Sequence, residues 1–203
     1  MSEKKLMLEI FRKKNADEFS AAISDRESRA DTGSAMAAVG ALAAALLHRA
    51  SLMCEDQQNE KLAWLVRNTE ILRTYMVNLI DEDVKCRGPL RRALKENDPR
   101  AIEAARQTGV NICAEIIHMM QTCLEMAVDL LPFAEQNAAS YIKESAELAL
   151  AAAKGCVPYI LMMGSYSSDD TYRYVLKREN ELNIEALQAA YEKLQEALSA
   201  MDA

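Results

Sequence analysis

The stretch TGSAMAAVGALAAALL, at residues 32–47, decides the fold. Residues 35–47 carry no polar side chain, so a helix here is expected to be enclosed by other helices on all sides. Small residues recur at every fourth position and let a neighbouring backbone approach closely: Gly33, Ala37, Ala41 and Ala45. The apolar run is shorter than the ~18 residues that a membrane span needs. We therefore predict a buried central helix and no membrane association.

The composition favours a single helical domain. The chain has 203 residues, of which 50% are hydrophobic, with only 6 glycines and 4 prolines. Helix-forming residues dominate, and a chain of this length can bury a core large enough for one domain. We expect that domain to cover residues 1–203. The net charge of −7 argues against a nucleic-acid partner, whose binding surface needs clustered Lys and Arg.

The cysteines and the first residues favour a cytoplasmic protein. No N-terminal targeting signal is visible, because charged residues interrupt every apolar run there. The number of cysteines is odd, and most of them occupy apolar positions. Reduced, buried thiols explain them better than a disulfide framework does: Cys54, Cys86, Cys113, Cys123 and Cys156.

Apolar residues at steps of three and four predict a long helix over residues 62–94. The Gly88-Pro89 pair is expected to kink or restart this helix, since proline lacks the amide that bonds back to the preceding turn. Asp98 is the expected cap of the next helix, with Pro99 at its first position.

Two further helices complete the predicted architecture. One is expected over residues 140–155, with a kink at Pro158, and the last over residues 170–200. We find no alternating pattern typical of a strand. The sequence therefore predicts an all-α, single-domain bundle of long helices around the buried Ala/Gly-rich helix.

The amino end of the central helix, at Gly33 and Ser34, is open to two interpretations. A helix start presents free amides and a partial positive charge, which suit a carboxylate or phosphate, and glycine lets a ligand come close. Alternatively, this is an ordinary cap, in which Thr32 or Ser34 bonds the first turn. Asp31, beside this point, weakens the attraction for an anion.

Asp83 lies on the apolar stripe of its helix, so its carboxylate is expected to point inward. A buried charge is costly unless it is paired, and burial raises a carboxyl pKa toward the range of proton transfer. The alternative is a structural ion pair with Arg87, four residues on along the same face. Asp81 and Lys85 repeat this spacing on a face that is expected to be more exposed.

A metal site is not expected. Cys113, His118 and Cys123 are spaced by five residues, and each step of five turns the helix by about 140°, so the three cannot converge on one ion. His48, at the end of the central helix, is interpreted as a cation of the last helical turn or as an interface residue.

The Gly-Ser entry into the small-residue helix, followed by LIDED at residues 79–83, resembles the formimidoyltetrahydrofolate cyclodeaminase and methenyltetrahydrofolate cyclohydrolase family. In that family a loop of the pattern PTPGGGS leads into the helix. Residues 28–34 here read SRADTGS and keep only the last glycine and the serine.

Other family positions have changed. The family segment NAISDA corresponds to NAASYI at residues 137–142, which places Tyr141 where the family has an aspartate. Two asparagines of the family pattern correspond to Tyr159 and Met163. The likeness covers about residues 16–180, and the packing positions are retained better than the polar ones.

The resemblance implies a homodimer that binds a folate-type ligand near the helix-entry loop. The implied reaction is either ring closure of a formimino group with loss of ammonia or hydrolysis of a methenyl bridge. A tetrahydrofolate derivative is then the substrate, and neither a cofactor nor a metal is needed. The residues implied are Asp83 as proton relay, the amides of Gly33 and Ser34 and the side chain of Ser140 as ligand contacts, and Arg29 and Lys154 as partners of a glutamate tail.

The changed residues motivate a second hypothesis, a helical dimer that has kept the scaffold and lost the chemistry. Asp31 and Thr32 add bulk where the family has glycines, and Tyr141 cannot supply a carboxylate. Such a protein would bind another metabolite or a protein partner.

Overall fold

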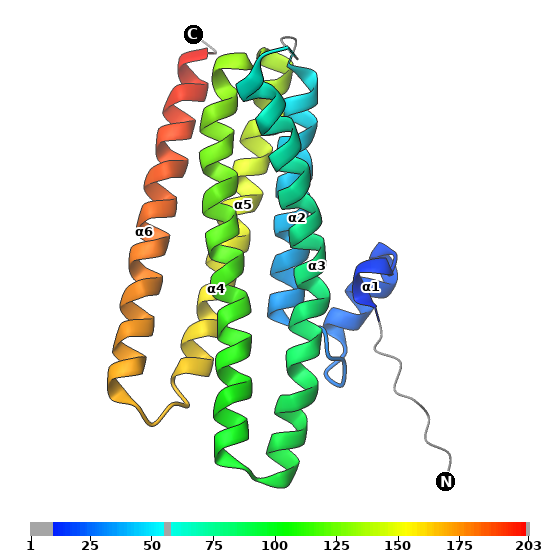
Figure 1. Cartoon of the computed structure of the whole chain (residues 1–203), viewed down its shortest axis with the longest axis vertical. Helices are drawn as coiled ribbons and strands as arrows, with labels where there is room; N and C mark the ends of the chain where they lie inside the picture. The colour runs from blue at the N-terminus through cyan, green and yellow to red at the C-terminus, as the bar shows by residue number, and fades with distance from the viewer. Residues whose placement is uncertain (1–9, 55–57, 202–203) are drawn as a thin grey trace.

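The computed structural model describes residues 10–54 and 58–201, and the folded elements within these ranges are all helical. In chain order the elements are η1 (Phe11–Lys13), α1 (Ala16–Ser24), α2 (Thr32–Met53), α3 (Glu60–Glu96), α4 (Pro99–Leu130), η2 (Leu131–Phe133), α5 (Gln136–Gly164) and α6 (Asp170–Met201). The long helices α2 to α6 alternate in direction along one axis (Figure 1). This confirms the prediction of an all-helical bundle.

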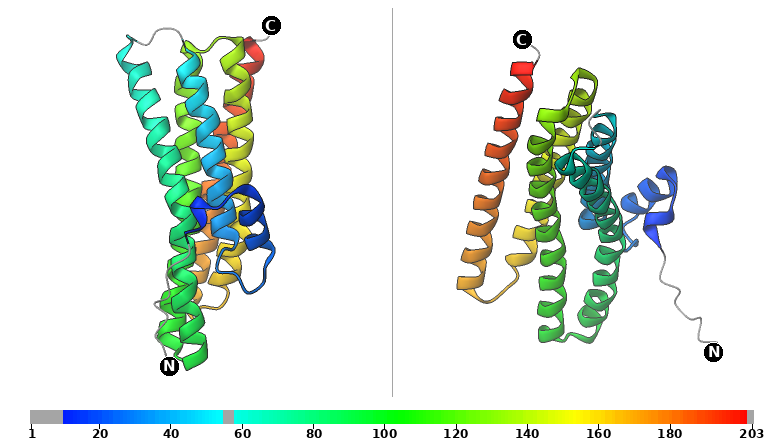
Figure 2. Two further views of the ribbon diagram at one scale, coloured as in Figure 1. Left: turned by 90° about the vertical axis from the view of Figure 1, so that its right-hand side faces the viewer. Right: turned by 45° about the horizontal axis from the view of Figure 1, so that its top comes forward.

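The helices α2, α3, α4 and α5 form a four-helix bundle. Each helix packs on the next one in the chain, and α5 also packs on α2. The last helix, α6, packs on the outside of this four-helix bundle, against α4 and α5. The short α1 lies beside α2 and α3, away from α6 (Figures 1 and 2). The hydrophobic core therefore lies between four helices, and α2 is one of the four rather than a central helix that the others surround.

The helix α2 occupies a corner of the ring, and this corrects one expectation. Its alanines at 37, 43 and 44 are fully buried, but Leu42 is 60% exposed and Leu52 is 56% exposed. In the side view of Figure 2, α2 runs along the face toward the viewer. Enclosure on all sides is therefore wrong for a single chain, because three neighbouring helices leave the fourth side of α2 open.

Two helices, α2 and α5, are each long and apolar enough to cross a membrane by length and composition. In the sequence, the apolar run at residues 35–47 alone is too short for a membrane span. The helix α2 is longer than that run and extends over 22 residues. Both helices pack in the bundle, and core helices of soluble bundles have the same composition.

Glycines set the closest helix contacts of α2. A Cβ atom on Gly40 would lie 2.5 Å from Cε of Met76 and 3.1 Å from the sulfur of Met120. On the α5 side, a Cβ atom on Gly155 would overlap the sulfur of Met36. Methionine thioethers therefore fill the space that the missing side chains leave on both sides of α2.

The helix boundaries confirm some of the predicted signals and correct others. Asp98 caps α4, because its carboxylate accepts hydrogen bonds from the amides of Arg100 and Ala101 at 3.0 and 3.2 Å. A restart at Gly88-Pro89 is wrong, since α3 continues through both residues to Glu96. Likewise, α5 begins before residue 140 and passes through Pro158. Both prolines are exposed, so their rings meet solvent rather than a packed neighbour.

Candidate active site

The candidate site lies where the amino end of α2 meets the middle of α3. Asp83 of α3 is fully buried, as the apolar stripe predicted. Its Oδ2 accepts hydrogen bonds from the amide of Ser34 at 2.9 Å and from the Ser34 hydroxyl at 2.8 Å. The first turn of α2 therefore donates to a carboxylate of the same chain.

Gly33 makes room for this carboxylate. A Cβ atom at position 33 would lie 2.6 Å from Cγ of Asp83 and would overlap Oδ1. The cap itself is Asp31, whose side chain accepts a hydrogen bond from the amide of Thr32 at 2.8 Å. The predicted cap by Thr32 or Ser34 is therefore wrong, and Gly33 is needed for the approach of Asp83.

One carboxylate oxygen of Asp83 differs from the other in its hydrogen bonding. Its Oδ1 is buried and makes no hydrogen bond within residues 10–54 and 58–201. Burial raises the pKa of Asp83, and the charge of Arg87 and the hydrogen bonds from Ser34 oppose that increase. A raised carboxyl pKa in a desolvated position is typical of proton-transfer groups.

Arg87 does not form the predicted ion pair with Asp83. Its Nη2 lies 2.7 Å from Oδ2 of Asp31, in the loop before α2. Its guanidinium also stacks 4.8 Å from the ring centre of Tyr159 on α5. The loop carboxylate competes successfully because it reaches the guanidinium from outside the core, where less desolvation is required.

Tyr159 and its neighbours complete the site. Burial raises the pKa of Tyr159 to about 12, so the phenol is neutral at physiological pH. Gly109 of α4 admits its hydroxyl, because a Cβ atom there would lie 2.7 Å from that oxygen. The resemblance identified Tyr159 only as a changed family position, and its stacking partner lies 72 residues away along the chain.

The nearby thiols are not activated. Desolvation raises the pKa of Cys86 to about 11, and a hydrogen bond with Cys113 raises the pKa of Cys156. Protonated thiols are poor nucleophiles. Within residues 10–54 and 58–201 none of the five cysteines forms a disulfide, as predicted.

The neighbouring Asp81 serves a different purpose from the one expected. It is only 8% exposed and accepts hydrogen bonds from the amides of Phe11 at 2.7 Å and Arg12 at 3.3 Å. The predicted exposed pair with Lys85 is wrong, because Lys85 pairs with Glu82 instead. Asp81 therefore anchors the segment before α1 to α3.

A cavity of about 300 Å³ opens beside the site. Arg87 and Asp31 line it together with residues 23–26, 28, 30, 90, 91 and 94, but Asp83 does not. The Asp31–Arg87 ion pair therefore separates Asp83 from this cavity.

The remaining predicted ligand residues lie in three places. Arg29 is in the loop before α2 and lines two cavities together with Arg91 of α3. Lys154 is exposed on α5 and donates a hydrogen bond to Gln188 of α6 at 2.7 Å. Ser140 bonds the carbonyl of Asn137 near the start of α5, 19 residues and about 28 Å of helix from Tyr159. Within one chain, Ser140 is not near Asp83.

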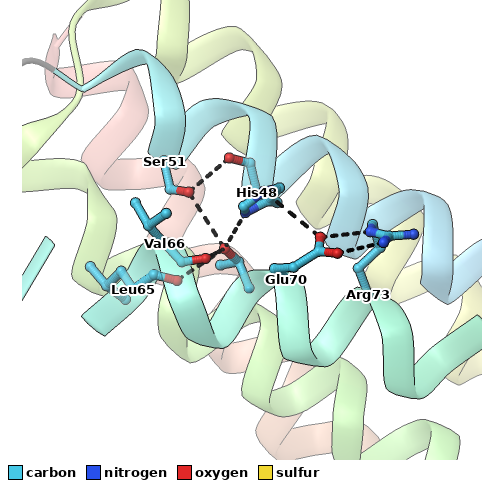
Figure 3. Close-up of polar contacts among 7 residues, drawn as sticks. His48, Ser51, Leu65, Val66, Glu70 and Arg73 are labelled. Atoms are coloured by element: carbon cyan, nitrogen blue, oxygen red, sulfur yellow. Dashed lines mark hydrogen bonds and ion pairs between the residues drawn. The ribbon is translucent and has the colours of Figure 1, made fainter. Parts of the chain in front are cut away.

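A second polar junction joins α2 and α3 at the other end of α2 (Figure 3). His48 Nδ1 lies 3.0 Å from the Thr69 hydroxyl, and Nε2 lies 3.7 Å from Glu70. Glu70 is held by Nε of Arg73 at 2.7 Å. His48 is thus an interhelical residue, and no pattern in the sequence indicated these partners.

Cys113, His118 and Cys123, whose spacing argued against a metal site, lie in different environments. Cys113 and Cys123 are buried in the core, whereas His118 is exposed. Cys123 faces Ser145 of α5, with its sulfur 3.6 Å from the hydroxyl. The three side chains therefore do not meet at one point.

Comparisons with known proteins agree with this fold. The family model described as formiminotransferase-cyclodeaminase matches residues 15–182. The crystal structure of formiminotetrahydrofolate cyclodeaminase from Thermotoga maritima has a TM-score of 0.85 at 19% sequence identity, covering 94% of this chain and 98% of that chain. No curated protein matches the sequence. Because the family model covers most of the sequence, from α1 into α6, the chain belongs to the formiminotransferase-cyclodeaminase family.

Proposed function

We propose that this protein acts on a tetrahydrofolate derivative, either by ring closure of a formimino group with loss of ammonia or by hydrolysis of a methenyl bridge. Family membership supports the substrate class. The observation that carries the catalytic part is the buried carboxyl of Asp83, which has a raised pKa and an oxygen without a hydrogen bond inside the described chain.

Both reactions pass through a tetrahedral carbon between two heteroatoms, and both need a proton to be moved. In the protonated form, Asp83 would donate its proton to the departing nitrogen. In the ionised form it would accept a proton from the attacking water or amine. The bonds from Ser34 fix Oδ2, so Oδ1 is the oxygen left for this transfer.

Substrate must gain access to Oδ1 past the Asp31–Arg87 ion pair. An anionic ligand group competes with Asp31 for Arg87, and its binding would open the way to Asp83. In this proposal Arg29 contacts the glutamate tail, whereas Lys154 lies elsewhere in the chain, on the face of α5 that bonds α6. Gly33 and Ser34 contact the ligand only after this rearrangement, since they face Asp83 in the structure.

The test follows methenyltetrahydrofolate turnover by absorbance in the wild type and in Asp83→Asn, with formimino-tetrahydrofolate as the second substrate. The expected result is turnover by the wild type and a loss of at least about 100-fold in the variant, the lower range for a general acid–base group. Asp129→Asn is the matched control, because Asp129 is half-exposed and pairs with Lys61 at the far end of α3 from Asp83. An inactive wild type whose melting temperature no folate shifts would contradict the proposal.

A scaffold without catalysis is the second candidate function. It is favoured by the ion pair that separates Asp83 from the adjacent cavity and by Tyr141, whose ring centre lies 4.7 Å from the Arg49 guanidinium. In this case the protein binds another metabolite or a protein partner. A thermal-shift screen of metabolites with a pull-down separates the candidates, because a stoichiometric protein partner without folate affinity supports only the scaffold.

We further propose that the protein is a homodimer formed through the open side of α2. Leu42 and Leu52 of α2 and Ile71 of α3 are each more than half exposed, which is unusual for large apolar side chains near a bundle core. Sedimentation at micromolar concentration should show a dimer, and Leu42→Glu should shift it toward monomer. A monomeric wild type would contradict the dimer.

The proposed setting is the cytoplasm, without membrane or nucleic-acid partners. The reactions need no cofactor, because the folate derivative is the substrate. Treatment with a metal chelator should therefore leave turnover unchanged, and a loss of turnover that added metal restores would contradict this.

A further inference from the structure

We propose that the solvent-facing surface of α3 around Gly88 and Pro89 is a binding site for a small anion that carries several negative charges. A cavity of about 660 Å³ lies there, lined by residues that we call the basic basin: Arg29, Lys85, Gly88, Pro89, Arg91, Arg92 and Lys95. This volume is within the range of small-molecule sites.

The basic basin concentrates one sign of charge. All five of its charged residues are positive, although the chain as a whole has a net charge of −7. Like charges this close repel one another, as the i,i+4 pair Arg91 and Lys95 does on the helix surface. A bound anion relieves this repulsion.

Two of the five cations are already engaged in ways that shape the basin. Arg91 donates hydrogen bonds from Nη2 to the carbonyls of Glu27 and Ser28 at 2.9 and 2.8 Å, which ties the loop bearing Arg29 to α3. Lys85 pairs with Glu82, three residues earlier on α3.

The other three cations remain available. Among the residues that the structure describes, no ion pair or hydrogen bond is made by the side chains of Arg29, Arg92 or Lys95. Three available cations match an anion with two or three charges, and guanidinium groups bind carboxylate and phosphate in a bidentate manner.

Gly88 leaves open space at the wall of the basic basin. A Cβ atom on Gly88 would meet nothing within 4 Å, so the position opens onto free space between the turns that carry Lys85 and Arg92. A bulky residue at this position would fill the hollow without removing a cation. Shape and charge can therefore be tested separately.

Oligocarboxylates and oligophosphates share the required chemistry, and the two arms of the experiment distinguish them. Citrate and tripolyphosphate are each titrated into the full chain by calorimetry, without folate. At least one should bind saturably, with an affinity that falls as salt is raised. The double variant Arg92→Ala/Lys95→Ala and the filling variant Gly88→Leu should each weaken binding by about tenfold or more, as expected when a charged hydrogen bond is lost or a site is blocked.

The matched control is Arg67→Ala/Lys143→Ala, which removes two exposed cations from other surfaces and changes the net charge equally. Its affinity should stay within about twofold of the wild type, as for sites without shared partners. Saturable binding of neither anion by the wild type would overturn the proposal, as would equal weakening in the control and in the basin variant. Because no folate turnover is measured, an inactive enzyme with an intact anion site would contradict the proposed function only.

Discussion

The two ends of α2 contact α3 through polar groups in contrasting ways. At the carboxyl end, His48, Thr69 and Glu70 form a junction that is partly exposed, with the His48 side chain 21% accessible. At the amino end, Asp83 is fully buried and one of its oxygens has no hydrogen bond within the described chain. A buried carboxylate with an unpaired oxygen lowers the stability of the fold. The need for stable packing therefore accounts for the His48 junction better than for the Asp83 junction.

At the carboxyl-end junction the hydroxyl groups of Thr69 and Ser51 both form hydrogen bonds. The Thr69 hydroxyl proton is directed to the carbonyl of Leu65 at 2.9 Å or of Val66 at 3.0 Å. The Ser51 hydroxyl donates to the His48 carbonyl at 2.7 Å. Nδ1 of His48 lies 3.0 Å from the same Thr69 hydroxyl, and the donor in this contact follows the His48 tautomer. The polar side chains of this junction thus have partners, whereas the Asp83 junction leaves one buried carboxylate oxygen without a hydrogen bond among the described residues.

The largest expected effect breaks the Asp83 junction by crowding. Gly33→Ala places a methyl group against a carboxylate that two hydrogen bonds hold in place, and should lower the free energy of unfolding by about 3 kcal/mol. Gly88→Ala is the control, since it meets open space and should raise stability by about 0.5–1 kcal/mol through helix propensity. Urea denaturation measures both, and equal effects would show that Gly33 is not constrained by Asp83.

A smaller effect is expected from removing the hydroxyl that bonds Asp83. Ser34→Ala should cost about 2 kcal/mol, because hydrogen bonds to charged groups are stronger than neutral ones. Thermal and urea unfolding give the value. A cost near zero would indicate that Asp83 is neutral and weakly bonded.

At the other junction, Thr69→Val should cost only about 1 kcal/mol, since the partly exposed His48 ring can form a hydrogen bond with water instead. The measurement is the same urea titration. A loss as large as that of Ser34→Ala would remove the contrast between the two junctions.

The smallest effect concerns pH. A carboxyl whose pKa is raised on folding holds its proton more tightly in the native state, so its contribution to stability is present below the unfolded value of about 3.9 and is lost as pH rises through the folded pKa. Each tenfold gain in proton affinity on folding corresponds to about 1.4 kcal/mol. The free energy of unfolding measured from pH 4 to 8 should therefore decline less in Asp83→Asn than in the wild type. Parallel profiles would show that the pKa of Asp83 is not raised.

The sequence predicted the features that depend on neighbours along the chain. The stripe over residues 62–94 became α3, and the Asp98-Pro99 start of α4 was correct, because periodicity and capping are local properties. The same stripe correctly placed Asp83 inside the bundle.

Features that depend on distant partners were not predicted. Arg87 had an aspartate four residues away, yet it pairs with Asp31 and stacks on Tyr159, and no periodicity encodes such a choice. The open side of α2 was missed for a similar reason. Apolar composition indicates that a surface needs covering, but it does not say whether the cover comes from the same chain.

The two methionines that rest on Gly40 of α2 make the bundle sensitive to oxidants. Conversion of the Met76 or Met120 thioether to a sulfoxide adds a polar oxygen beside Gly40, where even a Cβ atom has too little room. Both side chains are fully buried, so the native fold shields them. Once the helices have separated, oxidation of either sulfur would hinder their return, and transient unfolding under peroxide would become irreversible damage.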